Sequence, residues 1–248
     1  MNPKISLSLV FGTLLLVGCP DLSAQPGINI YTDFGENNVS QGLFIKTAGF
    51  ASYKFGKYLL ESGFQLDLKN TNNTFFSGFS MSGSRNFKIT NFPLEITGFW
   101  ISTPFSELLR ETNWGARLNR ESNHFEYLIG AHFRTYAFRQ KAIREYGIGQ
   151  SASKIHETMN LLYSVGYQLK PRNNSWNAGI SLTNYDNFMI EQETNPMLRL
   201  NGLYKLSSPL IIYLQAWYKS AGATNLAVNY FGFFFRTGII WNIRCAKD

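Results

Sequence analysis

The sequence predicts an all-β fold, an antiparallel transmembrane β-barrel of about 12 strands. Three observations support this prediction: a low content of charge, long stretches in which apolar and polar residues alternate, and connections that alternate in length. Of the 248 residues, 44% are hydrophobic, 16% are aromatic and only 16% are charged. Soluble domains carry about 25% charged residues, so this chain is poorly equipped to cover a water-facing surface.

Alternation with a period of two is typical of strands, whose successive side chains point to opposite faces. In residues 58–69, Leu60 and Phe64 share one face, and Glu61 and Asp67 share the other. Past residue 25, no segment keeps a helical apolar pattern for more than about two turns. We expect strands at residues 27–34, 43–55, 58–69, 75–88, 94–104, 113–119, 125–138, 158–170, 175–185, 197–206, 209–219 and 229–243.

Most of these segments reach the roughly 9 to 11 residues that a tilted strand needs to cross a membrane. The count carries an uncertainty of two strands, from 10 to 14, because 113–119 is short and 175–185 has room to extend. The connections at 56–57, 90–93, 121–124, 171–174 and 207–208 are short, and most of those between them are longer. This alternation is typical of outer-membrane barrels, whose periplasmic turns are short and whose extracellular loops are long.

The amount of apolar surface decides which face of the sheet points outward. Twelve strands would offer more large apolar side chains than one lumen accommodates, since about eight strands already enclose a space that side chains fill. The segment "YFGFFFRTGIIWNI" at 230–243, with Phe233, Phe235 and Trp241 on one side, is therefore expected to face acyl chains. Aromatic residues near the predicted strand ends would form interfacial belts. These are Tyr31, Tyr53, Tyr58, Trp100, Trp114, Tyr127, Trp176, Tyr204, Tyr218 and Trp241.

The N-terminus predicts export. Lys4 precedes an apolar stretch that is too short to span a bilayer, and Ala24 is a small residue before a plausible cleavage site. We therefore expect a signal peptide at 1–24 and a barrel domain at 25–248. Cys19 ends a lipoprotein-like "LVGC", but we favour its removal with the signal peptide over its acylation; Cys245 would then have no partner for a disulfide.

These features resemble the small outer-membrane β-barrels of Gram-negative bacteria, especially of the Bacteroidota type. The resemblance rests on a signal peptide ending in "SAQ", on repeated aromatic-rich hairpins and on the closing strand "YFGFFFRTGIIWNI". It covers residues 25–243 as a pattern and names no member. Many such barrels end at the aromatic residue of the last strand, whereas here "RCAKD" follows Ile243. The resemblance implies a location in the outer membrane.

The polar faces of the strands predict which charged side chains line the lumen. Acids occur mainly on the third, fifth and seventh predicted strands, and bases on the last three, so one wall would be mixed and the other positive. We expect no catalytic, cofactor or metal site. The lumen-lining candidates are Asp33, Lys46, Glu61, Asp67, Glu95, Arg117, Glu126, His132, Arg134, Arg199, Lys205 and Arg236.

Two interpretations of this lumen stay open. Excess positive charge in a water-filled lumen would make a narrow passive pore for small polar or anionic solutes. Alternatively, opposite charges pair across the lumen and close it, leaving a structural or accessory subunit of an envelope complex. The expected partners are the lipid bilayer, lipopolysaccharide and such envelope proteins. The basic residues form no run, which argues against nucleic acid.

An outer-membrane lipid hydrolase is a third hypothesis. Such an enzyme would need a catalytic histidine, and this chain has only three histidines. His124 falls in a short turn, His156 in the long loop 139–157, and His132 points inward, so an outward Ser–His arrangement finds no support. The loop 139–157 is predicted to be either a solvated extracellular loop or a lid over the mouth, with one or two helical turns around 142–146.

Overall fold

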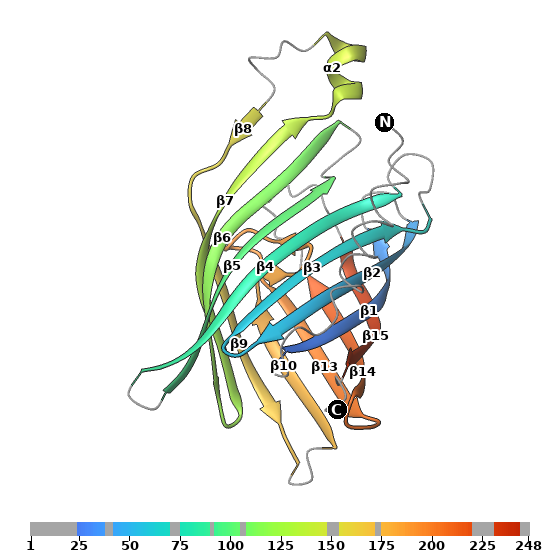
Figure 1. Ribbon diagram of the computed structural model, residues 1–248. Helices are drawn as coiled ribbons and strands as arrows, with labels where there is room; N and C mark the ends of the chain where they lie inside the picture. The colour runs from blue at the N-terminus through green and yellow to red at the C-terminus, as the bar shows by residue number, and fades with distance from the viewer. Residues whose placement is uncertain are drawn as a thin grey trace.

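The fold is a closed antiparallel β-barrel (Figure 1). The computed structural model describes residues 24–37, 42–69, 75–89, 92–104, 108–147, 154–171, 175–219 and 231–243. Twelve strands from this part of the chain form the barrel wall. They are β1 (Ala24–Asn37), β2 (Gly42–Phe55), β3 (Tyr58–Asp67), β4 (Phe76–Ile89), β5 (Phe92–Pro104), β6 (Leu109–Ser122), β7 (Phe125–Phe138), β9 (Asn160–Leu169), β10 (Trp176–Thr183), β13 (Met197–Lys205), β14 (Leu210–Lys219) and β15 (Phe231–Asn242).

Each wall strand pairs antiparallel with its neighbours in chain order, and the first strand pairs with the last. β1 pairs with β15 from Gly27 opposite Asn242 to Asn37 opposite Phe231. β9 follows β7 in the wall, while the short β8 (Lys154–His156) pairs only with the outer end of β7. Closure leaves no wall strand with an unpaired edge, and lipid does not tolerate unpaired backbone groups.

The predicted fold class is confirmed, and every predicted strand has its counterpart in the wall. The largest difference is β6, which runs over 109–122 instead of 113–119. The alternation of apolar and polar residues predicts a start at 113 because the outward residues before it, Arg110 and Thr112, are not apolar. Pairing with β5 and β7 holds this end of the strand, which lies beyond the apolar band.

Alternate residues of each strand face the outside, and these are the apolar ones. On β15, Phe235 and Trp241 expose 47% and 49% of their surface, whereas Phe234 and Arg236 expose 2% and 4%. The last strand therefore presents its aromatic side to the surroundings and a guanidinium to the lumen, as the sequence predicts.

Tyr31 is an exception to the predicted aromatic belt. It is 1% exposed and lies inside the barrel, so its assignment to the interface is wrong. Tyr31 is two residues from the inward-facing Asp33, and side chains two apart on a strand point the same way. The alternation of the strand, and not nearness to a strand end, decides where this ring lies.

Connections at the two ends of the barrel differ as expected. At the lower end of Figure 1 the strands join in tight turns, such as Gly56–Lys57, where Gly56 adopts a φ of +56° that side chains other than glycine rarely tolerate. At the upper end, α2 (Gln140–Tyr146) and β8 extend from β7. No helix in the described ranges is both long and apolar enough to cross a membrane. Residues 1–23 of the expected signal peptide, with Cys19, lie outside the described ranges, as does Cys245, and the last residue expected in that peptide, Ala24, is the first residue of β1.

Lysine substitutions at two depths in the membrane test whether these residues face lipid. We expect Phe235→Lys, near the middle of β15, to lower the free energy of unfolding from liposomes by about 2–4 kcal/mol, and Trp241→Lys, near the strand end, by about 0–1 kcal/mol in charge cost. Urea titrations of the barrel folded in vesicles measure both. Equal costs at the two depths would contradict a lipid-facing β15.

Candidate functional site

The chain turns into the lumen directly after β10. Asn184 makes this turn by bonding to the backbone of β9 with both ends of its side-chain amide. Its Oδ1 accepts from the Tyr163 N–H at 2.9 Å, and its Nδ2 donates to the Leu161 carbonyl at 2.8 Å. The next residues form a small hairpin of β11 (Tyr185–Asp186) and β12 (Met189–Ile190). We call residues 185–190 the inner hairpin.

Apolar side chains of the inner hairpin touch distant parts of the wall. Phe188 packs on Phe50 of β2, with ring centroids 5.3 Å apart. Tyr185 meets Phe99 of β5 edge-on at 5.5 Å. Ile190 belongs to the same buried cluster as Tyr185 and Phe99. Because β2 and β5 lie on a different side from β10, the inner hairpin reaches across the lumen. By its place in the alternation of short and long connections, 186–196 is expected to be a long extracellular loop, but its first residues are instead buried inside the barrel.

Arg236 of β15 is the main polar anchor of the inner hairpin. Its Nη1 and Nη2 donate to the two carboxylate oxygens of Asp186, both at 2.8 Å. Its Nε and Nη2 donate to Asp33 of β1 at 2.7 and 3.1 Å. The guanidinium carbon lies 3.9 Å from the centre of the Tyr31 ring. Paired guanidinium and carboxylate forks are among the strongest hydrogen-bonded contacts in proteins.

The positive charge of Arg236 keeps the Asp186 carboxyl ionised. Burial by itself would raise the pKa of the Asp186 carboxyl, but the Arg236 guanidinium and its hydrogen bonds hold that pKa below its ordinary value. Asp186 therefore remains a carboxylate throughout the neutral range. Breaking the contact would leave a buried charge without its partner, which is costly.

Two further cations hold the C-terminal side of the hairpin. Lys219 of β14 lies 2.6 Å from the carboxylate of Glu191, and both side chains are almost fully buried. Arg134 of β7 donates to the Ile190 carbonyl at 2.7 Å and lies 3.4 Å from Glu111 of β6. The anchors thus come from β7, β14 and β15.

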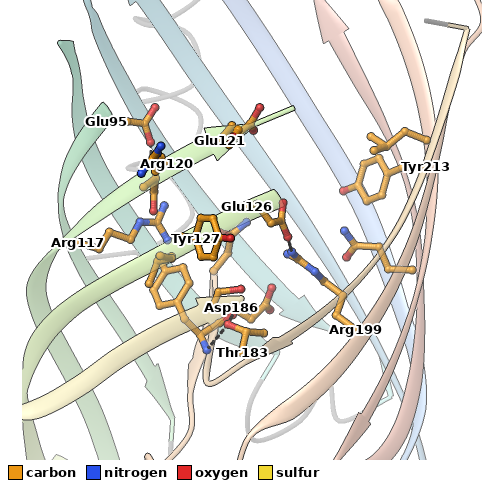
Figure 2. Close-up of a pocket in the computed structure, with 18 of the residues that line it drawn as sticks. Glu95, Arg117, Arg120, Glu121, Glu126, Tyr127, Thr183, Asp186, Arg199 and Tyr213 are labelled. Atoms are coloured by element: carbon orange, nitrogen blue, oxygen red, sulfur yellow. Dashed lines mark hydrogen bonds and ion pairs between the residues drawn. The ribbon is translucent and has the colours of Figure 1, made fainter. Parts of the chain in front are cut away.

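A polar cavity of about 760 Å³ lies between the inner hairpin and the barrel end that carries the tight turns. Tyr185, Asp186 and Asn187 line it from the hairpin, and Ser122 and Asn123 line it at the β6–β7 turn. Figure 2 shows Arg117 and Glu95 on one side of this space and Arg199 and Tyr213 on the other. We call it the vestibule. By the usual orientation of such barrels its end with tight turns is periplasmic.

Charges in the vestibule are partly neutralised. Arg199 of β13 donates to Glu126 of β7 at 2.6 Å, an ion pair that passes over the two strands between them. Glu95 accepts from the Asn119 amide at 2.7 Å. The Arg117 guanidinium lies 4.3 Å from the centre of the Tyr185 ring, and its buried Nε has no hydrogen-bond partner among the described residues.

The sequence-predicted lumen residues fall into separate groups. The vestibule is lined by Glu95, Arg117, Glu126, Arg199 and Arg236. Asp33 and Arg134 belong to the buried anchors or their partners, and His132 is fully buried. Lys46 and Asp67 face each other across β2 and β3, Glu61 lies on β3, and Lys205 is exposed at the end of β13.

Opposite charges meet within the lumen more often than the expected positive wall suggests. Arg199 and Arg236 lack an acid on their own strands, as the sequence shows, but each finds one on another element. Asp186 and Glu191 are absent from the predicted lumen residues because they fall in a connection that the sequence pattern predicts to be an outer loop. The sequence does hold one indication of an inward loop: Asp186 and Glu191 lie close to the apolar residues Phe188 and Ile190.

The three histidines form no catalytic group with a described serine. His132 faces the lumen with no described hydrogen-bond partner for either ring nitrogen. His124 bonds to the Gln168 carbonyl, and His156 to the Thr135 hydroxyl. Among the described residues, no cluster of three or more His, Cys, Asp or Glu side chains is placed to hold a metal ion.

Comparison with solved structures finds the same fold in outer-membrane porins. The KdgM porin matches 88% of this chain and 99% of its own with a TM-score of 0.53 and 12% identity. The NanC porin matches 87% of this chain and 100% of its own with a TM-score of 0.50 and 10% identity. No protein-family model matches the sequence, and no curated protein matches it.

The chain is a 12-strand outer-membrane β-barrel with a porin-like fold. At 10–12% identity the likeness to these porins establishes the fold alone. The Bacteroidota origin expected from the sequence stays a prediction.

Loss of the Asp186 charge should loosen the inner hairpin. Removing one partner of a buried ion pair costs about 3–5 kcal/mol, although here Asp33 still pairs with Arg236 and reduces that cost. We expect Asp186→Asn to speed amide hydrogen exchange in residues 184–191 by at least about tenfold while the wall strands keep their protection.

Hydrogen-exchange mass spectrometry of the folded barrel measures this difference. Gln192→Asn, at an exposed position of the same loop, is the matched control and should change nothing. Equal protection in Asp186→Asn and the unsubstituted chain would show that Arg236 does not hold the hairpin.

Proposed function

We propose that this barrel is a narrow pore for small polar solutes, with a preference for anions, and that the inner hairpin is its gate. The observation that carries this proposal is the vestibule: a polar space of about 760 Å³ that the inner hairpin bounds on one side. The hairpin is held by ion pairs, hydrogen bonds and ring contacts, all of which are reversible.

The polar lining supports passage of hydrated solutes. Buried polar groups in proteins are normally hydrogen-bonded. Arg117 Nε and Asn119 Oδ1, whose residues line the vestibule, lack such partners among the described residues. These two atoms are buried, but the side chains that carry them line the vestibule, and a guanidinium and an amide are suited to a solute that carries both negative charge and hydroxyl groups.

The distribution of ion pairs among the vestibule residues supports the preference for anions. Glu126 and Glu121 have cationic partners in Arg199 and Lys170, whereas Glu95 accepts hydrogen bonds from an amide and a hydroxyl and keeps its negative charge. Arg117 has a ring contact but no carboxylate within ion-pair distance among the described residues. A structure of the KdgM porin, with 10% identity and a TM-score of 0.50, is described as a complex with oligogalacturonate. That precedent supports an acidic solute as the first to test.

A non-conducting structural barrel is the second candidate, and the hairpin anchors favour it. Arg236, Lys219 and Arg134 hold the hairpin from different strands, and Phe188 and Tyr185 fill space beside it. If this arrangement never opens, the barrel serves as an envelope subunit instead of a pore.

Release of the hairpin separates these two functions. We expect the double variant Asp186→Asn/Glu191→Gln to open more often than the unsubstituted protein in planar bilayers, because it removes the two carboxylates by which this loop pairs with Arg236 and Lys219, while Asp33 stays paired with Arg236. Single-channel recording measures the open probability. Absence of current steps from both proteins, each shown to be folded, would favour the non-conducting barrel.

The Arg199–Glu126 pair offers a matched test of selectivity. Glu126→Gln and Arg199→Gln break the same contact but change the charge of the vestibule in opposite directions. We expect the first to raise the preference for chloride over potassium and the second to lower it. Reversal potentials in a salt gradient measure both, and shifts of the same sign would argue that ions do not pass this pair.

A further inference from the structure

Arg85 occupies an unusual place for a charged residue, on the outward face of the barrel. Alternation along the twelve wall strands leaves few charged residues at outward positions, namely Glu36, Arg85, Arg110 and Arg120, and of these Arg120 also lines the vestibule (Figure 2). Glu36, Arg110 and Arg120 lie within three residues of a strand end, whereas four more residues of β4 follow Arg85. Arg85 is also exposed, so its charge is directed toward the surroundings of the barrel.

The neighbours of Arg85 on this face are aromatic or apolar. Tyr58 of β3 lies opposite Arg85 on one side, and Ile96 of β5 on the other. They expose 44% and 43% of their surface. The Arg85 guanidinium carbon lies 5.5 Å from the centre of the Tyr58 ring, which in turn stacks on Phe55 at 5.5 Å. The ring contact holds the guanidinium against the outer surface.

The position of Tyr58 places this group at the membrane boundary. Tyr58 directly follows the tight turn at 56–57, which lies beside β4 at the end opposite α2 (Figure 1). Tyrosine rings concentrate at the level of the lipid headgroups. The turn adds a second exposed cation, Lys57, whose carbonyl accepts from the N–H of Asn86 at 2.8 Å, next to Arg85 along β4.

Neither cation has an acidic partner in the part of the chain that the structure describes. Among the described residues, no carboxylate lies within ion-pair distance of Arg85 or Lys57. The lumen is different, since Arg134, Arg199 and Arg236 all have acidic partners there. An outward cation at the boundary of a bilayer is most favourable where a phosphate accepts its hydrogen bonds.

We propose that Arg85, Lys57 and Tyr58 form a binding site for the headgroup of an anionic phospholipid in the periplasmic leaflet. The phosphate accepts from the Arg85 guanidinium, Lys57 adds a second positive charge, and the acyl chains lie along the outward apolar residues. Leu60 and Met81, both more than half exposed, provide that surface on the membrane side of the site.

Lipid retention by the full-length folded barrel tests the proposal. The probe is phosphatidylglycerol, offered with an equal amount of phosphatidylcholine in mixed micelles, and native mass spectrometry counts the lipids that stay bound. We expect the unsubstituted barrel to retain phosphatidylglycerol about fivefold better than phosphatidylcholine, and Arg85→Gln to abolish that preference. Arg144→Gln, which removes an equal charge from α2 far from this site, is the control and should keep it.

Two further variants keep the test decisive if Arg85→Gln does not fold. Arg85→Lys keeps the charge without the planar fork and should retain part of the preference, and Tyr58→Leu, which removes the ring, should weaken it several-fold. Folding of each is checked by its heat-dependent shift in gel mobility. Unchanged lipid preference in folded Arg85→Gln, or in both substitute variants, would overturn the proposal.

A competition arm distinguishes a lipid from a free anion. Millimolar inorganic phosphate should leave the bound phosphatidylglycerol in place, because it lacks the acyl chains that the outward apolar residues hold. Displacement by inorganic phosphate alone would assign the site to a soluble anion and refute the lipid assignment. The inference is independent of conduction, since Arg85 faces away from the lumen.

Discussion

The pairing of β1 with β15 is the contact on which this structure depends. A strand in lipid must find a partner for every backbone N–H and C=O, and water is absent there to substitute. Closure of the sheet supplies these partners, with Gly27 opposite Asn242 at one end of the seam. Once the sheet is closed, the alternation of each strand divides its side chains into a lipid set and a lumen set. The apolar exterior and the polar interior both follow from that division.

In the lumen of this barrel, an enclosed charged group is surrounded by partners from several elements. Arg236 is fully surrounded, yet Asp33, Asp186 and Tyr31 satisfy it from three directions. Such a group favours one arrangement of the inner hairpin because a displaced hairpin leaves an unpartnered charge. Under the proposed gating function, an anionic solute that competes for Arg236 would replace part of what the hairpin supplies, so opening of the hairpin would depend on this guanidinium.

The charges on the two faces serve different surroundings. Inside, cations and carboxylates lie within reach of one another, and the remaining polar groups surround the vestibule. Outside, charge is almost confined to strand ends, where headgroups and water begin. Arg85 lies farther from its strand end than the other outward charges, and it packs against Tyr58 at the membrane boundary. The proposed solute path and the proposed lipid site therefore use opposite faces of the barrel wall.

The sequence by itself determined the number of strands to within two, their approximate limits and the face that each presents, because a period of two and the pattern of turns are local properties of the chain. Phe235 outward and Arg236 inward follow from position alone. Only the tertiary structure decided the course of residues 184–196 and the partners of the lumen charges. Asp186 and Arg236 are 50 residues apart and meet because the hairpin folds inward. No strand periodicity describes such a loop, since its conformation depends on a lumen that exists only after the barrel has closed.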